Sequence, residues 1–247
     1  MVGSRSGQCR RAGMFFGLSA ALFANASRAQ SLDHDTTLTD APATPRAGTV
    51  RLTGGGAGGT SSGDASVAAQ VQWTPLPRLS GDAGLVWQSG SVGPSARLRY
   101  QFLEQSAEGL DVAAGCRYKS VGLKPQNGEL ELLVAVGRRW NRVSAVLDAV
   151  YGHESGGPGQ DLEAKAFVGY DITRPVRLGL EGRVQAEFVD ENGIHRPTLN
   201  DVDLRTGPSV AWQASSTVQL QGLVGAGKLR GPGPIAPVAM AFLSVDL

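Results

Sequence analysis

The residues best suited to do chemistry lie in the stretch YGHESGG, residues 151–157. His153 and Ser155 are two positions apart, so their side chains point to the same side of an extended chain. A serine hydroxyl becomes a nucleophile when an adjacent base takes its proton, and a carboxylate can orient that base. Glu163 lies downstream and supplies such a carboxylate. These three residues form the candidate catalytic set of the sequence.

This set resembles the lipid A 3-O-deacylases, which are outer-membrane barrels with a His-x-Ser pair and a downstream glutamate. The resemblance implies a lipid-modifying enzyme that uses His153, Ser155 and Glu163. The family pattern continues with Asn-Ala-Gly, whereas residues 156–158 of this chain are Gly-Gly-Pro. Glu163 also falls on the opposite face of its predicted strand. We therefore favour the alternative interpretation, a Gly/Pro-rich loop that contains one histidine and one serine.

Groups that bind metals or cofactors are scattered along the chain. Three histidines lie in separate polar segments with no ligand spacing: His34, His153 and His195. Cys116 is the only cysteine outside the first thirty residues, so it can form neither a disulfide nor a cysteine metal site within the chain. Residues 190–192, Asp-Glu-Asn, could bind calcium, but a solvent-exposed acidic turn is the commoner explanation. We expect no metal and no cofactor.

The N-terminus has the order of an export signal. Arg5, Arg10 and Arg11 form a basic region, and residues 13–24 are an apolar run too short to span a bilayer. A cut after Ala29 would leave residues 30–46, QSLDHDTTLTDAPATPR, which are polar and have no apolar period. An apolar N-terminal helix retained in the mature protein is the alternative. We expect a signal peptide over 1–29 and a disordered periplasmic leader over 30–46.

Length and charge narrow the class of protein. The chain has 247 residues and a formal net charge of +1, without the basic surplus of a nucleic-acid-binding protein. Beyond the signal there is no apolar run of the length that a transmembrane helix requires. We therefore expect no nucleic-acid partner and no helical membrane span.

Residues 47–247 consist of about twelve segments in which apolar and polar residues alternate, as in SARLRYQF at 95–102. Such segments form strands with one apolar and one polar face. The polar faces carry acids and bases in nearly equal numbers, which can pair between neighbouring strands. These charges include Arg97, Arg99, Arg117, Lys119, Glu129, Glu131, Asp148, Glu163, Lys165, Arg177, Glu181, Arg183, Glu187 and Arg205. Alternation alone does not decide whether the apolar faces line a core or contact lipid.

The large aromatic residues favour contact with lipid. They lie on the apolar faces near the strand ends, while the middles of the strands hold valine, leucine, alanine and glycine. A soluble core would bury its rings at mid-strand, whereas rings at both ends are typical of the two aromatic girdles of an outer-membrane barrel. The predicted girdles contain Trp73, Trp87, Tyr100, Tyr118, Trp140, Tyr151, Tyr170, Phe188 and Trp212.

In this pattern residues 47–247 resemble the bacterial outer-membrane β-barrel proteins of the porin-like kind. The resemblance implies a single transmembrane antiparallel β-barrel in a Gram-negative outer membrane, with lipid as its partner and the charged faces lining the lumen. Many members end in an aromatic residue, whereas this chain ends in Leu247. We expect a non-enzymatic barrel, either a narrow channel for small solutes or a structural barrel that binds surface ligands. The lipid-modifying enzyme and a secreted β-sandwich binding module remain alternatives.

Overall fold

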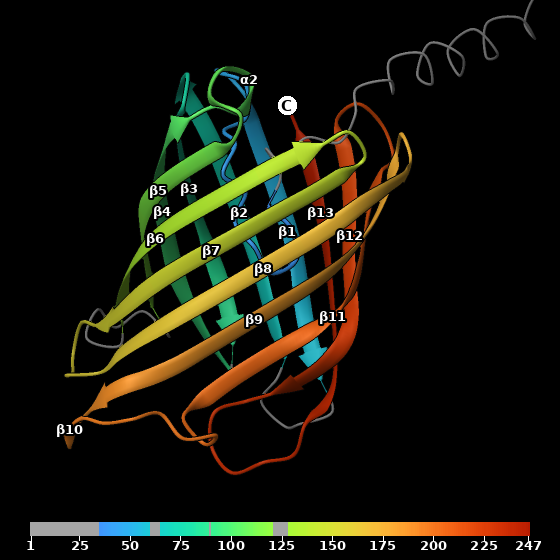
Figure 1. The fold of residues 1–247 in the computed structure, drawn as a ribbon. Helices are drawn as coiled ribbons and strands as arrows, with labels where there is room; N and C mark the ends of the chain where they lie inside the picture. Colours follow the sequence, from blue (N-terminus) through green and yellow to red (C-terminus); the bar gives the residue numbers. More distant parts are fainter. Residues whose placement is uncertain (1–34, 60–64, 89, 121–127) are drawn as a thin grey trace, which may run out of the picture.

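A computed structural model describes residues 35–59, 65–88, 90–120 and 128–247. The predicted signal peptide and residues 30–34 of the predicted leader lie outside the described residues. The described chain forms one antiparallel barrel (Figure 1). Its strands are β1 Val50–Gly59, β2 Ser66–Leu76, β3 Leu79–Gln88, β4 Ser91–Leu103, β5 Asp111–Ser120, β6 Gly128–Trp140, β7 Val143–Glu154, β8 Gln160–Thr173, β9 Val176–Asp190, β10 Gly193–Ile194, β11 Val202–Gln213, β12 Val218–Lys228 and β13 Ala236–Asp246. A one-turn helix, α2 Gln105–Glu108, lies between β4 and β5.

Twelve of these strands close the barrel. From β1 to β9 each strand pairs with the next, and the series continues through β11, β12 and β13. β13 then pairs with β1, with Asp246 opposite Arg51. β10 is a short extension that pairs only with the end of β9 within the described chain. Closure leaves no unpaired strand edge in the barrel wall, and it confirms the predicted all-β barrel of about twelve strands.

The two ends of the barrel differ in their connections. We call the end that carries Leu247 and α2 the C-terminal rim, and the end that carries β10 the long-loop rim (Figure 1). At the C-terminal rim the 77–78 turn places Arg78 at φ 68°, and the 141–142 turn places Asn141 at φ 53°. Positive φ values are typical of tight hairpin turns. β2 continues to Leu76 and β3 begins at Leu79, so only residues 77 and 78 connect these two strands.

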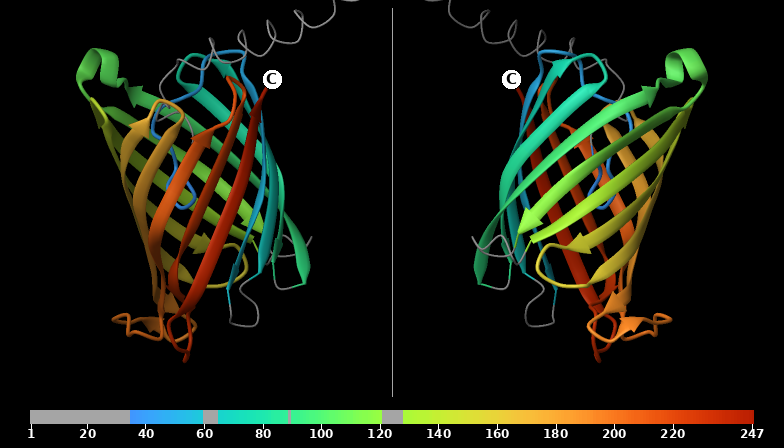
Figure 2. Two further views of the ribbon diagram at one scale, coloured as in Figure 1. Left: turned by 90° about the vertical axis from the view of Figure 1, so that its right-hand side faces the viewer. Right: turned by 90° about the vertical axis from the view of Figure 1, so that its left-hand side faces the viewer.

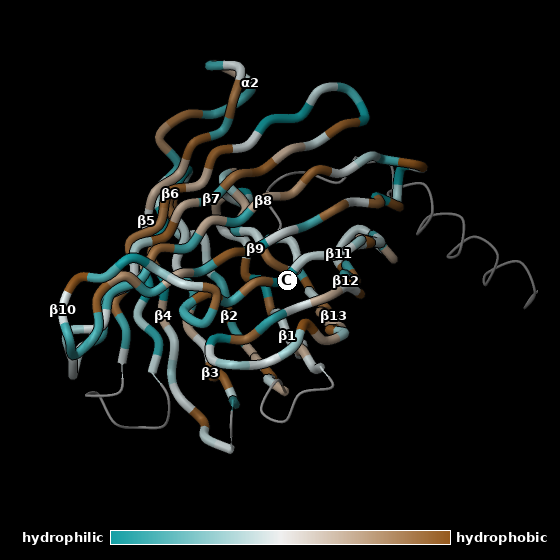
Figure 3. Tube along the Cα trace, turned by 60° about the horizontal axis from the view of Figure 1, so that its bottom comes forward, coloured by the Kyte–Doolittle hydropathy of each residue, from teal (hydrophilic) through white to brown (hydrophobic). Residues whose placement is uncertain are grey.

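The apolar faces of the strands point outward. Leu98 is 53% exposed and Leu180 is 61% exposed, whereas Arg99 on the same strand as Leu98 is 1% exposed. Figure 3 shows hydrophobic and hydrophilic residues alternating along the strands. Exposed apolar side chains over the whole circumference, around a polar interior, form a surface suited to lipid. Among the described residues no helix is long and apolar enough to cross a bilayer.

The aromatic residues lie near both rims. Near the C-terminal rim the exposed rings include Trp73, Tyr100, Phe102, Trp140, Tyr170 and Trp212. Near the long-loop rim, Trp87 is exposed, while Tyr118, Tyr151 and Phe188 are half-buried. The rings of Tyr151 and Phe188 lie 6.4 Å apart. Between the two sets the outward residues are mainly aliphatic.

The interior contains residues 35–46, which we call the leader segment (Figure 2, blue, inside the barrel). The sequence predicted a disordered periplasmic leader here, and the structure differs from that expectation. Residues 37–42 are buried inside the barrel. Several of their polar groups, such as the backbone N–H groups of Leu38 and Asp40, find partners on the inner wall, and these contacts offset the entropy lost when a flexible segment is ordered.

Candidate functional site

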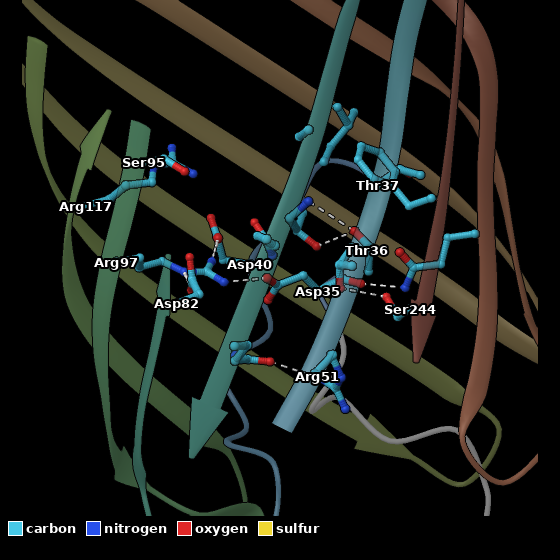
Figure 4. Close-up of a pocket in the computed structure, with 18 of the residues that line it drawn as sticks. Asp35, Thr36, Thr37, Asp40, Arg51, Asp82, Ser95, Arg97, Arg117 and Ser244 are labelled. Carbon is cyan, nitrogen blue, oxygen red and sulfur yellow. Dashed lines mark hydrogen bonds and ion pairs between the residues drawn. The ribbon is translucent and has the colours of Figure 1, made fainter. Parts of the chain in front are cut away.

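The leader segment folds back on itself inside the lumen. The backbone N–H of Thr36 donates to the carbonyl oxygen of Thr39 over 2.9 Å, which makes a tight turn. The backbone N–H of Ala41 donates to the Asp35 carboxylate over 2.7 Å. Together these bonds bring Asp35 and Asp40 onto the same side, toward strands β3 and β4 (Figure 4).

Asp40 is the most tightly held residue of the segment. Its carboxylate accepts from Lys165 Nζ over 2.8 Å and also from the guanidinium of Arg97. Arg97 in turn donates to Asp82 over 2.6 Å and to Asp35 over 2.7 Å. Arg97, Lys165 and Asp40 are all buried. A buried charge is tolerated when opposite charges and hydrogen bonds surround it, as they do here.

These neighbours control the ionisation of Asp40, which lies in the leader segment outside the membrane-spanning strands. Burial alone would raise the pKa of its carboxyl group. The adjacent Lys165 and Arg97 lower that pKa more than burial raises it, so it stays well below its ordinary value. Asp40 therefore carries its negative charge inside the lumen.

Further hydrogen bonds attach the segment to the inner wall of the barrel. Glu181 on β9 accepts from the Leu38 backbone N–H over 2.7 Å and from the Thr36 hydroxyl over 2.8 Å. Near the C-terminal rim, the Thr44 backbone N–H donates to the Gln101 side chain over 2.8 Å. These bonds satisfy backbone groups that would otherwise be buried without partners.

Two apolar contacts complete the fit. Leu38 packs against Leu223 of β12 and Val238 of β13. Pro42 lies against Gly137 of β6, where a Cβ atom would stand 2.5 Å from the Pro42 ring carbon Cγ. Only glycine leaves room for Pro42 at this point of the wall. The leader segment thus contacts the wall on opposite sides of the lumen.

The remaining lumen charges pair mainly between neighbouring strands. Lys119 lies 2.6 Å from Glu131 and 3.1 Å from Glu129, and Glu131 also contacts Arg117. The other inward charges that the sequence singled out also have partners: Glu163 with Lys165 and Arg183, Arg177 with Asp171, Glu187 with Arg230, and Arg205 with Asp203. Asp148 accepts the Asp40 backbone N–H over 2.6 Å, and Arg99 donates to the Ala41 carbonyl oxygen.

Sequence reasoning missed several members of this site. Asp35 and Asp40 were assigned to a disordered leader, and the pair between Arg51 and Asp246, 2.6 Å apart, was not singled out. Asp82, which holds Arg97, was also missed. One available signal was the acidic character of the leader, because its carboxylates can pair with arginines on the inner wall.

A cavity of about 290 Å³ lies beside the leader segment (Figure 4). One wall is the leader segment itself, from Asp35 to Asp40. The opposite wall comes from β1, β2 and β13, and β3, β4, β5, β8 and β12 also contribute lining residues. This cavity lies inside the barrel and is lined by both polar and apolar side chains.

The candidate catalytic residues do not come together. His153 and Ser155 are exposed near the long-loop rim. Glu163 is 5% exposed and points into the lumen, where it accepts from Arg183 over 2.8 Å. His153 lies opposite Gln160 in the sheet, on the outward face. The carboxylate and the proposed base therefore lie on opposite faces of the barrel wall.

The histidine in the longest described loop has acidic neighbours. His195 lies 4.0 Å from Asp190 and 3.9 Å from Asp201, and both acids are in an exposed region. The described residues contain no group of three or more histidine, cysteine, aspartate or glutamate side chains placed to hold a metal ion.

The fold is similar to that of solved porins. The KdgM porin gives a TM-score of 0.58 at 10% sequence identity, with 80% of this chain and 99% of that chain covered. The NanC porin gives a TM-score of 0.59 at 9% identity, with 80% and 100% covered. A KdgM porin in complex with disordered oligogalacturonate gives 0.57 at 10% identity, with 81% and 99% covered. The sequence matches no protein-family model and no curated protein sequence.

Identities this low show a shared fold and nothing finer. The closed twelve-strand wall and its apolar exterior are those of a transmembrane β-barrel, and the solved porins share this fold. This confirms the barrel fold that the sequence predicted.

Proposed function

We propose that the protein is a non-enzymatic outer-membrane channel for small solutes, whose leader segment narrows the lumen. The observation that carries this proposal is the position of residues 37–42, buried inside the barrel beside a cavity of about 290 Å³. The proposal includes export by the predicted signal peptide, residues 1–29. Residues 30–247 would then reach the membrane.

The width of the barrel supports a channel over a purely structural barrel. Small barrels of about eight strands are filled by their own inward side chains, and wider ones enclose ligands or water. In this barrel the inward side chains leave space for a peptide segment and a cavity beside it. A barrel of twelve strands is thus wide enough to conduct when the leader segment is out of the lumen.

The pairing of charges supports weak ion selectivity. Acids and bases on the inner wall neutralise each other at short range, as with Glu131 between Arg117 and Lys119. A lumen with balanced charges attracts neither anions nor cations strongly. The exposed positions of His153 and Ser155, away from Glu163, give no support to the lipid-modifying alternative.

Single-channel recording in planar bilayers tests the proposal. The full chain is compared with a variant in which residues 35–46 are replaced by glycine and serine in equal number, which keeps the length and removes the carboxylates. We expect small current steps from the full chain and severalfold larger steps from the variant. Absence of steps from both proteins would contradict a channel. Equal steps from both would show that the leader segment does not narrow the lumen.

A further inference from the structure

The cavity beside the leader segment also indicates which solutes fit it, an inference that rests on the proposed channel. Its volume, about 290 Å³, is at the lower end of the range for small-molecule sites. The cavity is bounded on one side by the leader segment and on the other by β1, β2 and β13. A solute that enters the narrowed lumen must therefore match this lining.

The charged groups of the lining are already paired. Arg97 is held by Asp40 and Asp82, and Lys165 lies 2.8 Å from Asp40 and 2.9 Å from Glu163. A charged solute would have to break these pairs or lose its hydration without gaining a free partner. The lining therefore disfavours both anions and cations.

The wall formed by β1, β2 and β13 offers uncharged hydrogen-bonding groups. Thr53 and Ser244 lie 3.0 Å apart, and both line the cavity. Gln70 and Gln72 alternate on β2, so both amides face the same space. Hydroxyl and amide groups can each donate and accept hydrogen bonds, which matches the hydroxyl groups of a neutral solute.

The leader segment contributes one unused hydroxyl. The Thr37 Oγ1 atom has no hydrogen-bond partner among the described residues, although Thr37 is only 8% exposed and lines the cavity. A buried hydroxyl without a partner is costly, so a solute hydroxyl that bonds to it gains that energy back.

The lining also has an apolar surface. Phe242 of β13 lies over Gly55 of β1, where a Cβ would stand 2.4 Å from the ring atom Cδ1. Val86 and Ala68 add aliphatic surface. A ring with hydroxyl edges and C–H faces suits a lining of this kind, because its faces can pack on Phe242 while its edges bond to the amides.

We propose that the cavity between the leader segment and strands β1, β2 and β13 binds a small uncharged polyhydroxyl solute, of the size of a simple sugar. Gln70, Gln72 and the Thr37 hydroxyl supply hydrogen bonds, and Phe242 supplies the packing surface. The class is set by the pairing of every charged side chain that the argument uses and by the neutral hydrogen-bonding groups beside them, among which the Thr37 hydroxyl has no partner in the described chain.

Uptake into proteoliposomes that contain the full chain tests this class. Three probes of matched size are compared: D-glucose, D-gluconate and D-glucosamine, each radiolabelled. We expect glucose to enter faster than either charged probe by at least about fivefold, the factor for one net hydrogen bond. Uptake of gluconate or glucosamine equal to that of glucose overturns the solute class but leaves the channel standing. Absence of uptake for all three overturns both.

A pair of matched variants locates the site. Gln70→Leu removes an amide from the cavity, and Gln219→Leu removes an inward-facing amide of β12 that lies outside it. We expect Gln70→Leu to lower glucose uptake by about fivefold and Gln219→Leu to leave it unchanged. Equal losses, or no loss from Gln70→Leu, would overturn the assignment of the site.

Discussion

The two halves of the inner wall differ in chemistry. Strands β4 to β9 carry most of the inward charges, including Arg97, Glu131, Lys165 and Glu181, which are all buried. Strands β12, β13, β1 and β2 present mainly glutamine, serine, threonine and small or apolar residues. The charged half holds the leader segment, and the neutral half leaves a cavity open beside it.

The charged half of the wall is suited to the attachment of the leader segment, and the neutral half is suited to the passage of a solute. Charge pairs have strong preferences for partner and geometry, so they suit the fixation of a peptide in one position. Neutral hydroxyl and amide groups exchange partners readily, so they suit a solute that must leave again. Four variants test this difference. Each one removes or disturbs a contact of the leader segment with one half of the wall, or removes a hydroxyl that faces the cavity. All of them use one reporter chain, Ala41→Cys with Cys116→Ser, labelled by a water-soluble maleimide.

The largest effect is expected from Asp40→Asn, which breaks the attachment to the charged half. Arg97 and Lys165 lose a buried carboxylate partner, and the loss of one partner of a buried pair costs about 3 kcal/mol or more. The leader segment should then leave the lumen more often, and labelling of the reporter should speed up by about a hundredfold. Asp201→Asn, in an exposed loop, is the control and should have no effect. Unchanged labelling would mean that charge does not hold the segment.

Leu38→Ala tests the apolar contact between the leader segment and the neutral half. Removal of a buried leucine side chain costs about 2 kcal/mol or more, because the cavity left behind does not close fully. Leu38 packs on Leu223 and Val238, so labelling should rise by about thirtyfold. Val67→Ala, on the lipid-facing side, should leave labelling unchanged. If both variants behave alike, the packing of Leu38 does not stabilise docking.

Gly137→Ala tests the steric fit of the leader segment against the charged half without removing a charged side chain. The new Cβ would stand 2.5 Å from the Pro42 Cγ atom, so one of the two must move. Overpacking of this kind costs about 1–3 kcal/mol, and labelling should rise by about tenfold. In the control, Gly182→Ala, the new Cβ would stand 3.7 Å from the Thr206 hydroxyl, an ordinary contact distance, and no change is expected. A normal rate for Gly137→Ala would show that Pro42 is not seated there.

Thr37→Val should have the smallest effect on docking and a visible one on passage. The Thr37 hydroxyl has no partner within the described chain, so its loss should keep labelling within about threefold of the parent chain. Glucose uptake should nevertheless fall by about fivefold, because the solute loses a hydrogen bond. A rise in labelling comparable to that of Gly137→Ala would instead assign Thr37 to attachment.

The barrel could be predicted from the sequence because the alternation of apolar and polar residues along each strand is a local pattern. In SARLRYQF each outward residue is two positions from the next, and the aromatic residues at the strand ends indicated which face meets lipid. The inward position of Glu163 followed from the same parity. The 77–78 turn is harder to place from the sequence, because Pro75 and Pro77 are typical of loops although β2 continues through Pro75 to Leu76.

The leader segment was not predictable in the same way. A polar stretch without an apolar period has the same pattern whether water or a lumen surrounds it. Its partners are also remote: Thr44 and Gln101 are 57 residues apart, and Asp35 and Gln221 are 186 apart. The fit of Pro42 against Gly137 depends on a three-dimensional gap that no local pattern records.

The distribution of the leader contacts has a consequence for assembly. Its partners lie on β4, β6, β7, β8, β9 and β12, so no partly formed sheet offers the whole binding surface. A strand inserted one residue out of register would turn its lipid-facing side chains toward the leader segment. Docking of the leader segment therefore requires these six strands to be assembled in their correct register.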